Sequence, residues 1–212
     1  SRGLDDKRLE IIVERIHLIV FPIFVYVLIR AWSLLRLALI GEGLLVFVAF
    51  TWSWWRGTDF VFGGTAKGVI CGLLMAAVLA VANLYLLVRA PALPGVPSIR
   101  RLYAEVMQPM FGNLSVTEII VISSVAGIGE ELLFRGVLQL ELGLFPASVI
   151  FGLAHMGGGG TLAFGCWVMV MGGMLGILAI VTEGLLAPII AHAVYDAAAM
   201  SYIRWDGNER GA

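Results

Sequence analysis

Apolar stretches long enough to cross a lipid bilayer occupy most of this chain of 212 residues. Hydrophobic residues make up 60% of the sequence and charged residues 14%, whereas a soluble domain carries about a quarter of charged residues. A transmembrane helix needs about 20 apolar residues, so the length allows about six to eight helices and little else. The sequence therefore predicts an all-α fold, a polytopic integral membrane bundle of about seven transmembrane helices that forms a single domain over residues 1–212.

The charge balance argues against a nucleic-acid partner. The formal net charge is -1 and no basic run is longer than Arg100-Arg101, whereas a nucleic-acid-binding surface needs clustered Lys and Arg. No short apolar segment with a small-residue cleavage site precedes the first span, so we expect that helix to stay in the mature protein. The lipid bilayer and a membrane-associated molecule are the expected partners.

A proline-rich segment divides the predicted spans into two halves. Residues 89–101 contain three prolines, which interrupt helical hydrogen bonding, so we predict an extramembrane linker there. Residues 1–112 then comprise N-terminal helices and this linker, and residues 113–205 form a core that carries polar motifs. The N-terminal half has no clustered polar chemistry within its spans, although Gly41-Glu42-Gly43 interrupts the second one. The predicted helical segments are residues 16–29, 34–55, 60–88, 116–143, 144–156, 162–182 and 185–202, with a glycine hinge at residues 157–160 and an amphipathic turn at residues 102–111.

Three ionisable residues, Glu130, Glu131 and Arg135, lie within six positions of an otherwise apolar segment. A charge at the bilayer centre costs roughly 2.5 to 3.5 kcal/mol on insertion scales, so a chain that keeps three together is expected to use them. Glu131 precedes Arg135 by four residues, the favourable order for an intrahelical ion pair. Glu130 is rotated by about 100° from Glu131, which leaves it free to act as a general base. The alternative is a buried packing triad of all three side chains.

Two further motifs place histidines in later apolar segments. Phe151 precedes His155 by four residues and His192 precedes Asp196 by four, so each pair lies on one helical face. A carboxylate such as Asp196 can orient an imidazole and stabilise its charged form. One Glu, two His and one Asp are the groups needed to activate a water and stabilise an oxyanion. We therefore predict that Glu130, His155, His192 and Asp196 converge on one cavity in the membrane, with Phe151 beside it.

These three motifs, EExxxR, FxxxH and HxxxD, in successive helices resemble those of the CAAX prenyl protease and bacteriocin-processing family, also called the CPBP or ABI family, of intramembrane glutamate proteases. The resemblance covers about residues 116–202, and the first half is similar only as apolar helices. It implies an intramembrane peptidase without cofactor or metal. The site residues that it implies are Glu130 and His155 to bind and activate the attacking water, His192 and Asp196 to line the oxyanion site, and Glu131 and Arg135 to support them.

Asp196 departs from the family pattern, because the well-studied CAAX-processing members have asparagine at the matching position. An amide donates a hydrogen bond to an oxyanion, whereas an ionised carboxylate cannot. The sequence allows two solutions: Asp196 is protonated, or it holds His192 as the cationic donor.

Other intramembrane chemistries fit the sequence less well. It contains no HExxH motif of a zinc protease and no ExxH repeat of a di-iron bundle, but a zinc ion held by the converging Glu, His and Asp groups stays open. The resemblance implies an endopeptidase in a prokaryotic plasma membrane, acting on a prenylated CAAX tail, a leader peptide or a sorting tail. The alternative is a proton-coupled transporter or a catalytically silent membrane partner with these groups as a relay. The lack of an internal repeat between residues 1–88 and 113–205 disfavours a transporter.

Overall fold

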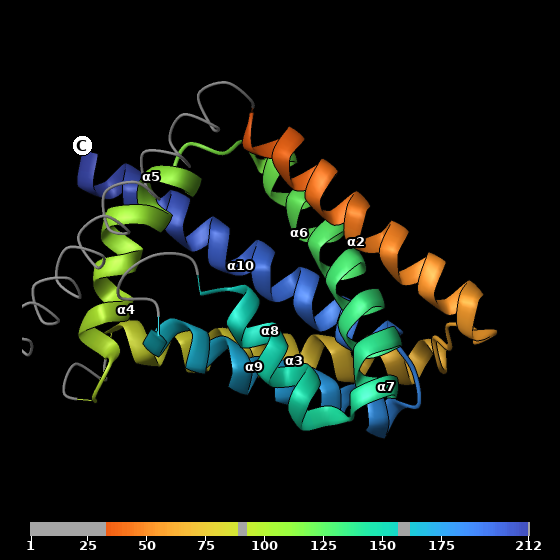
Figure 1. Cartoon of the computed structure of the whole chain (residues 1–212). Coiled ribbons are helices and arrows are strands. Elements are labelled where there is room, and N and C mark those ends of the chain that lie inside the picture. The colour runs from red at the N-terminus through yellow and green to blue at the C-terminus, as the bar shows by residue number, and fades with distance from the viewer. Residues whose placement is uncertain (1–32, 89–92, 157–161, 212) are drawn as a thin grey trace, which may run out of the picture.

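The computed structural model describes residues 33–88, 93–156 and 162–211, and these ranges contain helices and no strand (Figure 1). The predicted all-α fold is confirmed. The span predicted at residues 16–29 and the glycine hinge at residues 157–160 lie outside the described residues. The helices are α2 (Leu34–Arg56), α3 (Thr65–Val88), α4 (Val96–Leu102), η1 (Tyr103–Met107), α5 (Gln108–Phe111), α6 (Val116–Leu133), η2 (Phe134–Leu138), α7 (Gln139–Leu142), α8 (Leu144–Ala154), α9 (Leu162–Thr182) and α10 (Leu186–Gly211), of which η1 and η2 are π-helical.

Within the described ranges, α2, α3, α9 and α10 are long and apolar enough to cross a membrane. A fifth span results if the sharply bent pair Val96–Phe111 and Val116–Leu142 counts as one, and α8 is a shorter apolar helix. Large apolar side chains cover the outer surface, among them Phe47, Trp54 and Phe145. A soluble protein rarely exposes apolar patches of this kind. The chain is therefore an integral membrane protein.

Three predicted boundaries were wrong, one of them the end of the last helix, which was predicted at residue 202 and lies at Gly211. The helix predicted at residues 60–88 begins at Thr65, because the backbone before it pairs with the turn between α9 and α10. There the N–H groups of Leu185 and Leu186 donate to the carbonyls of Val61 and Phe62, at 2.9 and 3.1 Å. These bonds fix the start of α10 against the start of α3.

The predicted linker at residues 89–101 is also partly wrong, because α4 begins within it at Val96. Gly95 adopts a left-handed conformation before the helix, and Pro97 stands in the first turn. A proline is tolerated there because the first N–H groups of a helix have no intrahelical partner. The expected amphipathic turn at residues 102–111 corresponds to the continuation of this helix through η1 and α5.

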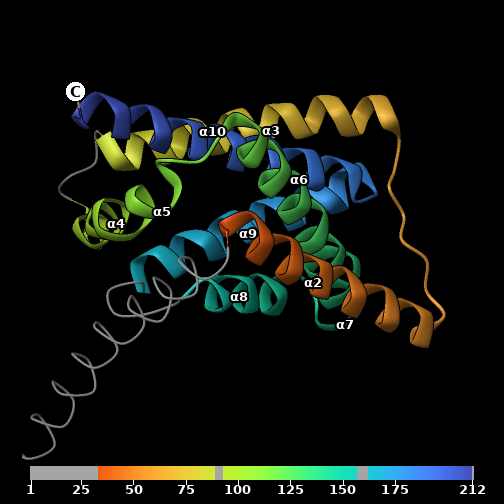
Figure 2. The ribbon, with the colours of Figure 1, turned by 90° about the horizontal axis from the view of Figure 1, so that it is seen from above.

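Helix α10 is the centre of the bundle, since it packs against α3, α6 and α9. Helix α2 covers α6, and α8 lies along α9 (Figures 1 and 2). Ala187 and Ala191 of α10 are fully buried against Leu79 of α3 and Leu175 of α9. In lipid there is no hydrophobic driving force between helices, so their association depends on van der Waals packing. Small residues such as these alanines allow the helices to approach closely enough for such packing.

The start of α6 is fixed by a capping box formed by Ser115 and Glu118. The Glu118 N–H donates to the Ser115 hydroxyl at 3.2 Å, and the Ser115 N–H donates to the Glu118 carboxylate at 2.9 Å. A cap of this kind stabilises a helix by about 1 kcal/mol. It sets where α6 begins and therefore where its later charged residues lie.

Gly127 allows α6 and α10 to come into backbone contact. A Cβ added at Gly127 would lie 2.9 Å from the Ala193 Cβ and 3.0 Å from the Ile189 carbonyl oxygen. Gly127 is one turn before Glu131, and Ala193 is next to His192. The close approach therefore sets the separation between the charged residues of the two helices.

Gly127→Leu should separate α6 from α10 and destabilise the bundle by about 1 to 3 kcal/mol, as overpacking of a tight interior does. We expect a lower Tm in detergent micelles, measured by circular dichroism. Gly41→Leu is the matched control, because a Cβ added there meets nothing within 4 Å. Equal Tm values for the two variants would contradict the close packing at Gly127.

Candidate active site

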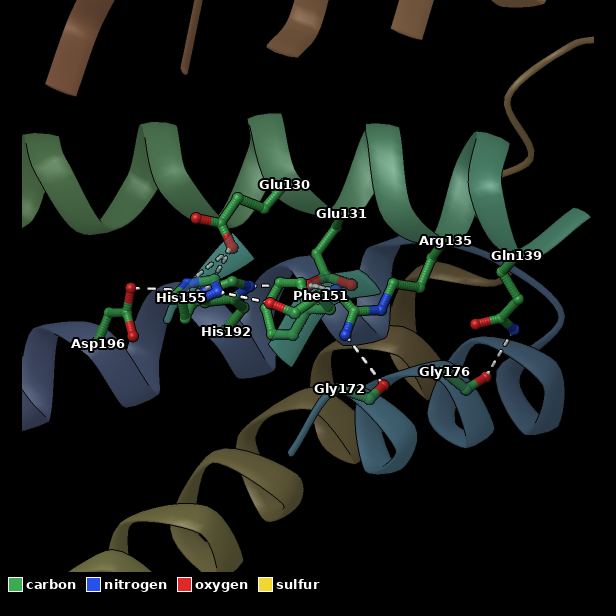
Figure 3. A network of polar contacts seen from close by, with 10 residues as sticks. All are labelled: Glu130, Glu131, Arg135, Gln139, Phe151, His155, Gly172, Gly176, His192 and Asp196. Atoms are coloured by element: carbon green, nitrogen blue, oxygen red, sulfur yellow. Dashed lines mark hydrogen bonds and ion pairs between the residues drawn. The ribbon is translucent and has the colours of Figure 1, made fainter. Parts of the chain in front are cut away.

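The structure brings together the four side chains that the sequence assigned to one site (Figure 3). Glu130 comes from α6, His155 follows the last residue of α8, and His192 and Asp196 belong to α10. The Glu130 Oε2 atom lies 3.8 Å from the Nε2 atoms of both His155 and His192. The His192 Nε2 atom lies 3.5 Å from Asp196 Oδ2. A carboxylate thus faces two imidazoles, with a second acid at one side.

His155 is oriented by the end of its own helix. Its Nδ1 atom lies 2.8 Å from the Phe151 carbonyl oxygen. Because a carbonyl can only accept, Nδ1 carries the proton and donates this bond. The Nε2 atom is consequently the one that faces Glu130, so the FxxxH spacing fixes both the ring position and its tautomer.

His192 is held by Glu131. The Nδ1 atom of His192 donates to Glu131 Oε1 at 2.7 Å, and Arg135 donates to the same oxygen at 2.6 Å. The predicted ion pair between Glu131 and Arg135 is confirmed, but it is part of a triad that includes His192. Asp196 lies on the other side of this ring, with Oδ2 3.5 Å from Nε2, and this position fits either of the two roles that the sequence leaves open for it.

The buried guanidinium of Arg135 ties the charged helix to α9. Its second nitrogen donates to the Gly172 carbonyl at 3.0 Å, and Gln139 donates in the same way to Gly176, four residues further on (Figure 3). A Cβ added at Gly172 would lie 2.9 Å from the Phe151 ring. A buried charge is tolerated only when it is paired and hydrogen-bonded, and Arg135 meets both conditions.

Phe151 packs in the middle of these groups, beside the site as predicted. The Arg135 Cζ atom lies 4.4 Å from the centre of its ring. The His155 and His192 rings lie 4.8 and 6.0 Å from it, centre to centre. This one aromatic ring therefore packs against the Arg135 guanidinium and both imidazoles.

The exposure of the side chains increases steadily across the site. The exposed fractions are 0% for Glu131, 2% for Arg135, 8% for His192, 14% for Glu130, 25% for Asp196 and 31% for His155. The ion pair is therefore the floor of the site. A reactant would meet His155, Asp196 and Glu130 first, which are the groups able to exchange protons with it.

Glu42 is the residue near this site that the sequence reasoning missed. Its Oε2 atom lies 2.6 Å from the position of a Cβ added at Gly129, the neighbour of Glu130. Among the described residues, neither Glu42 Oε2 nor Glu130 Oε2 has a hydrogen-bond partner, although both atoms are buried. The signal was present in the sequence as an acid inside an apolar span, which is a functional candidate in itself.

A zinc ion held by the converging acids and histidines is the alternative that the sequence leaves open. Within the part of the chain that the structure describes, no group of three or more His, Cys, Asp or Glu side chains is placed to hold a metal ion. What the four converging side chains offer is a proton acceptor, two imidazoles with defined tautomers and a second acid.

Comparison with known proteins bears on the segment that carries these residues. Residues 112–198 match the model of the type II CAAX prenyl endopeptidase Rce1-like family. This segment is therefore similar to the Rce1-like family. The uncharacterized protein YpbD of Bacillus subtilis (strain 168) is 33% identical over 97 residues, which are 46% of this chain and 51% of YpbD. The chain thus spans about half the length of this curated relative. No solved structure matches the chain significantly.

The Rce1-like segment contains Glu130, Glu131, Arg135, His155, His192 and Asp196, and Glu42 lies outside it. These six residues come from helices α6 to α10 and the segments between them. Glu42 comes from helix α2, which lies in the first half of the chain and outside the matched segment.

Glu131→Leu should destabilise the protein by about 3 to 5 kcal/mol, because it leaves the buried Arg135 charge without a partner. We expect a marked fall of Tm in detergent. The double variant with Arg135→Leu should recover much of the loss, since it removes both charges. A Glu131→Leu protein as stable as the wild type would contradict a supporting role for this carboxylate.

Proposed function

We propose that the chain is an intramembrane endopeptidase in which Glu130 activates a water to cleave a membrane-associated peptide. The observation that carries the proposal is the position of Glu130 Oε2, 3.8 Å from the Nε2 atoms of His155 and His192. This separation is too long for a direct hydrogen bond and suits a bridging water. The Rce1-like match of the same segment supports the reaction class.

In the first step Glu130 accepts a proton as one O–H bond of the water breaks. His155 orients the water through Nε2, which accepts because Nδ1 is the atom that carries the proton. The hydroxide oxygen forms a bond to the carbonyl carbon of the substrate. The carbonyl oxygen then carries a negative charge.

In the second step this negative charge is stabilised from the α10 side by a hydrogen bond from the neutral form of Asp196, and His192 can add one from Nε2–H only when both of its ring nitrogens carry a proton, since Nδ1 donates to Glu131. The charge returns to the carbonyl, the C–N bond breaks, and the proton held by Glu130 moves to the leaving amine nitrogen. No covalent intermediate with the protein forms. Donors placed before the reaction stabilise such a charge without reorganisation, and each contributes on the order of 10² or more in rate.

The triad of Glu131, Arg135 and His192 serves this chemistry by position. Glu131 accepts from Nδ1 of His192, so the Nε2 atom is turned toward Glu130 and Asp196. Asp196 can then act in its neutral form as a hydrogen-bond donor, as the asparagine of the resembling proteases does. We favour this role over the orientation of His192, since Glu131 already provides the orientation.

The substrate proposed is a peptide held at the membrane by a lipid or an apolar segment, with a prenylated CAAX-type tail as the first candidate because of the family match. It would enter from the lipid and meet the more exposed His155 and Asp196. The Bacillus relative makes a bacterial plasma membrane the proposed location.

Glu130→Gln should abolish peptide cleavage without loss of folding, because the amide keeps the shape and cannot accept the proton. Wild-type and variant proteins in proteoliposomes are incubated with a farnesylated, fluorescence-quenched CAAX peptide and with a bacterial membrane extract. New peptide ends are identified by mass spectrometry, with chelator and with serine- and cysteine-directed reagents present. The exposed Glu141→Gln is the matched acid-to-amide control.

New ends are expected with wild type and Glu141→Gln and absent with Glu130→Gln. The same ends from Glu130→Gln would overturn the assignment of the base. Activity that is lost on chelation and returns with zinc would show a metal enzyme instead. Proton-dependent uptake without any cleavage would favour the transporter.

Asp196→Asn distinguishes the two roles of this residue. If Asp196 is a neutral donor at the oxyanion, the amide preserves the donor and the variant should keep most of the wild-type kcat on a peptide spanning the identified cleavage site. If Asp196 acts as an anion that stabilises a cationic His192, the rate should fall on the order of 10² or more. We expect the first result, and Asp196→Leu should be inactive in both cases.

A further inference from the structure

His155 stands beyond the end of the helix that carries it. Helix α8 ends at Ala154, and the N–H of His155 donates to the Gly152 carbonyl at 3.2 Å. The N–H of Met156 donates to the Leu153 carbonyl at 3.0 Å. Helix ends fray readily, and His155 is the most exposed side chain of the site, at 31%. The position of its imidazole therefore depends on what holds these last two residues.

A second pair of residues, offset by one from the FxxxH motif, faces helix α9. Phe151 and His155 lie in the site, whereas Gly152 and Met156, each the next residue along the chain, contact α9. A Cβ added at Gly152 would lie 2.6 Å from the carbonyl oxygen of Gly165. The backbones of α8 and α9, which run side by side in Figure 2, therefore meet at this point.

The Met156 side chain lies on the bare Cα of Gly165. The three heavy atoms nearest to a Cβ added at Gly165 all belong to Met156: its Cγ, its Sδ at 2.9 Å and its Cε at 3.1 Å. Any other residue at position 165 would therefore compete with Met156 for this place. Gly165 is buried, and the flexible thioether of methionine fills irregular gaps well. Met156 thus anchors the turn after α8 to α9.

Helix α9 also holds the segment that carries the two acids. Arg135 donates to the Gly172 carbonyl at 3.0 Å, and Gly172 follows Gly165 by about two helical turns on the same face. The proposed base on α6 and the imidazole after α8 are therefore held against one face of one helix. Met156 supplies the part of this support that belongs to His155.

We propose that Met156 is a positioning residue of this site that acts through His155, keeping its Nε2 atom 3.8 Å from Glu130 Oε2. The role rests on the proposed function, in which His155 orients the attacking water. The bond from Nδ1 to the Phe151 carbonyl fixes the ring relative to α8, and the Met156 contact fixes the end of α8 relative to α9. Both are needed, since a misplacement of about 1 Å can cost about 10² in rate.

The effect on His155 is measured without substrate by nuclear magnetic resonance. The sequence has three histidines, and labelling them with a heavy nitrogen isotope gives a different coupling pattern between ring nitrogens and ring protons for each tautomer. Spectra are recorded in detergent micelles at about pH 8, where an ordinary imidazole is neutral. His155→Gln assigns the signals of this residue.

Wild type is compared with Met156→Ala, Met156→Leu, Gly165→Ala and the control Met174→Ala. Met174 is the matched control because it is a partly buried methionine of α9 that packs against the core formed by α3, α9 and α10. Its truncation removes the same atoms without touching the seat of Met156.

Wild-type His155 should show the proton on Nδ1, as its bond to Phe151 requires. Met156→Ala should replace this pattern by a mixture of the two neutral tautomers, because the turn is released from α9. Met156→Leu should keep it, since leucine and methionine fill similar volumes. Gly165→Ala should lose it, because the added methyl group displaces Met156, and this variant gives the result if Met156→Ala does not fold. Met174→Ala should leave it unchanged.

The same variants are then assayed in proteoliposomes on a peptide spanning the identified cleavage site. Met156→Ala and Gly165→Ala should lower kcat by about 10- to 100-fold with a smaller change in KM, since His155 orients the water rather than the peptide. Met156→Leu should keep most of the wild-type kcat.

A wild-type tautomer pattern or a wild-type kcat in folded Met156→Ala overturns the positioning role, and so does an equal loss of the pattern in Met174→Ala. The failure of the proposed function is seen separately. Peptide cleavage by Glu130→Gln refutes the base and leaves the resonance result for His155 unchanged, whereas an unaltered His155 in Met156→Ala refutes the anchor and leaves the cleavage result unchanged.

Discussion

One oxygen atom, Oε1 of Glu131, holds the site together. It accepts hydrogen bonds from Arg135 on its own helix and from His192 on α10, at 2.6 and 2.7 Å. Arg135 in turn reaches the Gly172 carbonyl on α9. Three helices are therefore locked by one fully buried anion. Because such an anion cannot lose a partner without a large cost, the relative positions of α6, α9 and α10 are fixed, and Glu130 is presented to the two imidazoles as a result.

The small residues make this lock possible. The charged groups can meet only because Gly127 brings α6 onto α10 and Gly172 brings α9 onto the Phe151 ring. In a membrane, close packing of this kind drives the association of helices in place of the hydrophobic effect. The polar network and the packing thus depend on each other: the glycines set the distances, and the ion pair makes a separation of the helices unfavourable.

The sequence predicted where the helices of the second half begin to within one residue, because long apolar runs separated by polar or glycine-rich residues give a strong signal. It ended the last helix at residue 202, whereas α10 continues to Gly211, because the residues beyond 202 are polar and the apolar pattern stops there. It also predicted which groups would meet, since spacings of four residues put side chains on one face. It could not give the partner of His192, because Glu131 lies 61 residues away and already had a nearer partner in Arg135. Nor did it place Glu42, as an acid flanked by glycines in an apolar span gives no hint of which helix it will face.

The π-helical segment η2 has a consequence for comparing this chain with its relatives. One extra residue in a helical turn rotates everything after it by about 100°. Gln139, on the far side of η2, donates to α9, and Glu141 reaches back to Arg56 on α2. The residues from Val116 to Leu142 therefore belong to two helical registers. A homologue that lacks the extra residue would keep the two acids before η2 in place and would turn a different face of α7 toward α9. Residues after η2 should therefore be aligned with those of relatives separately from the residues before it.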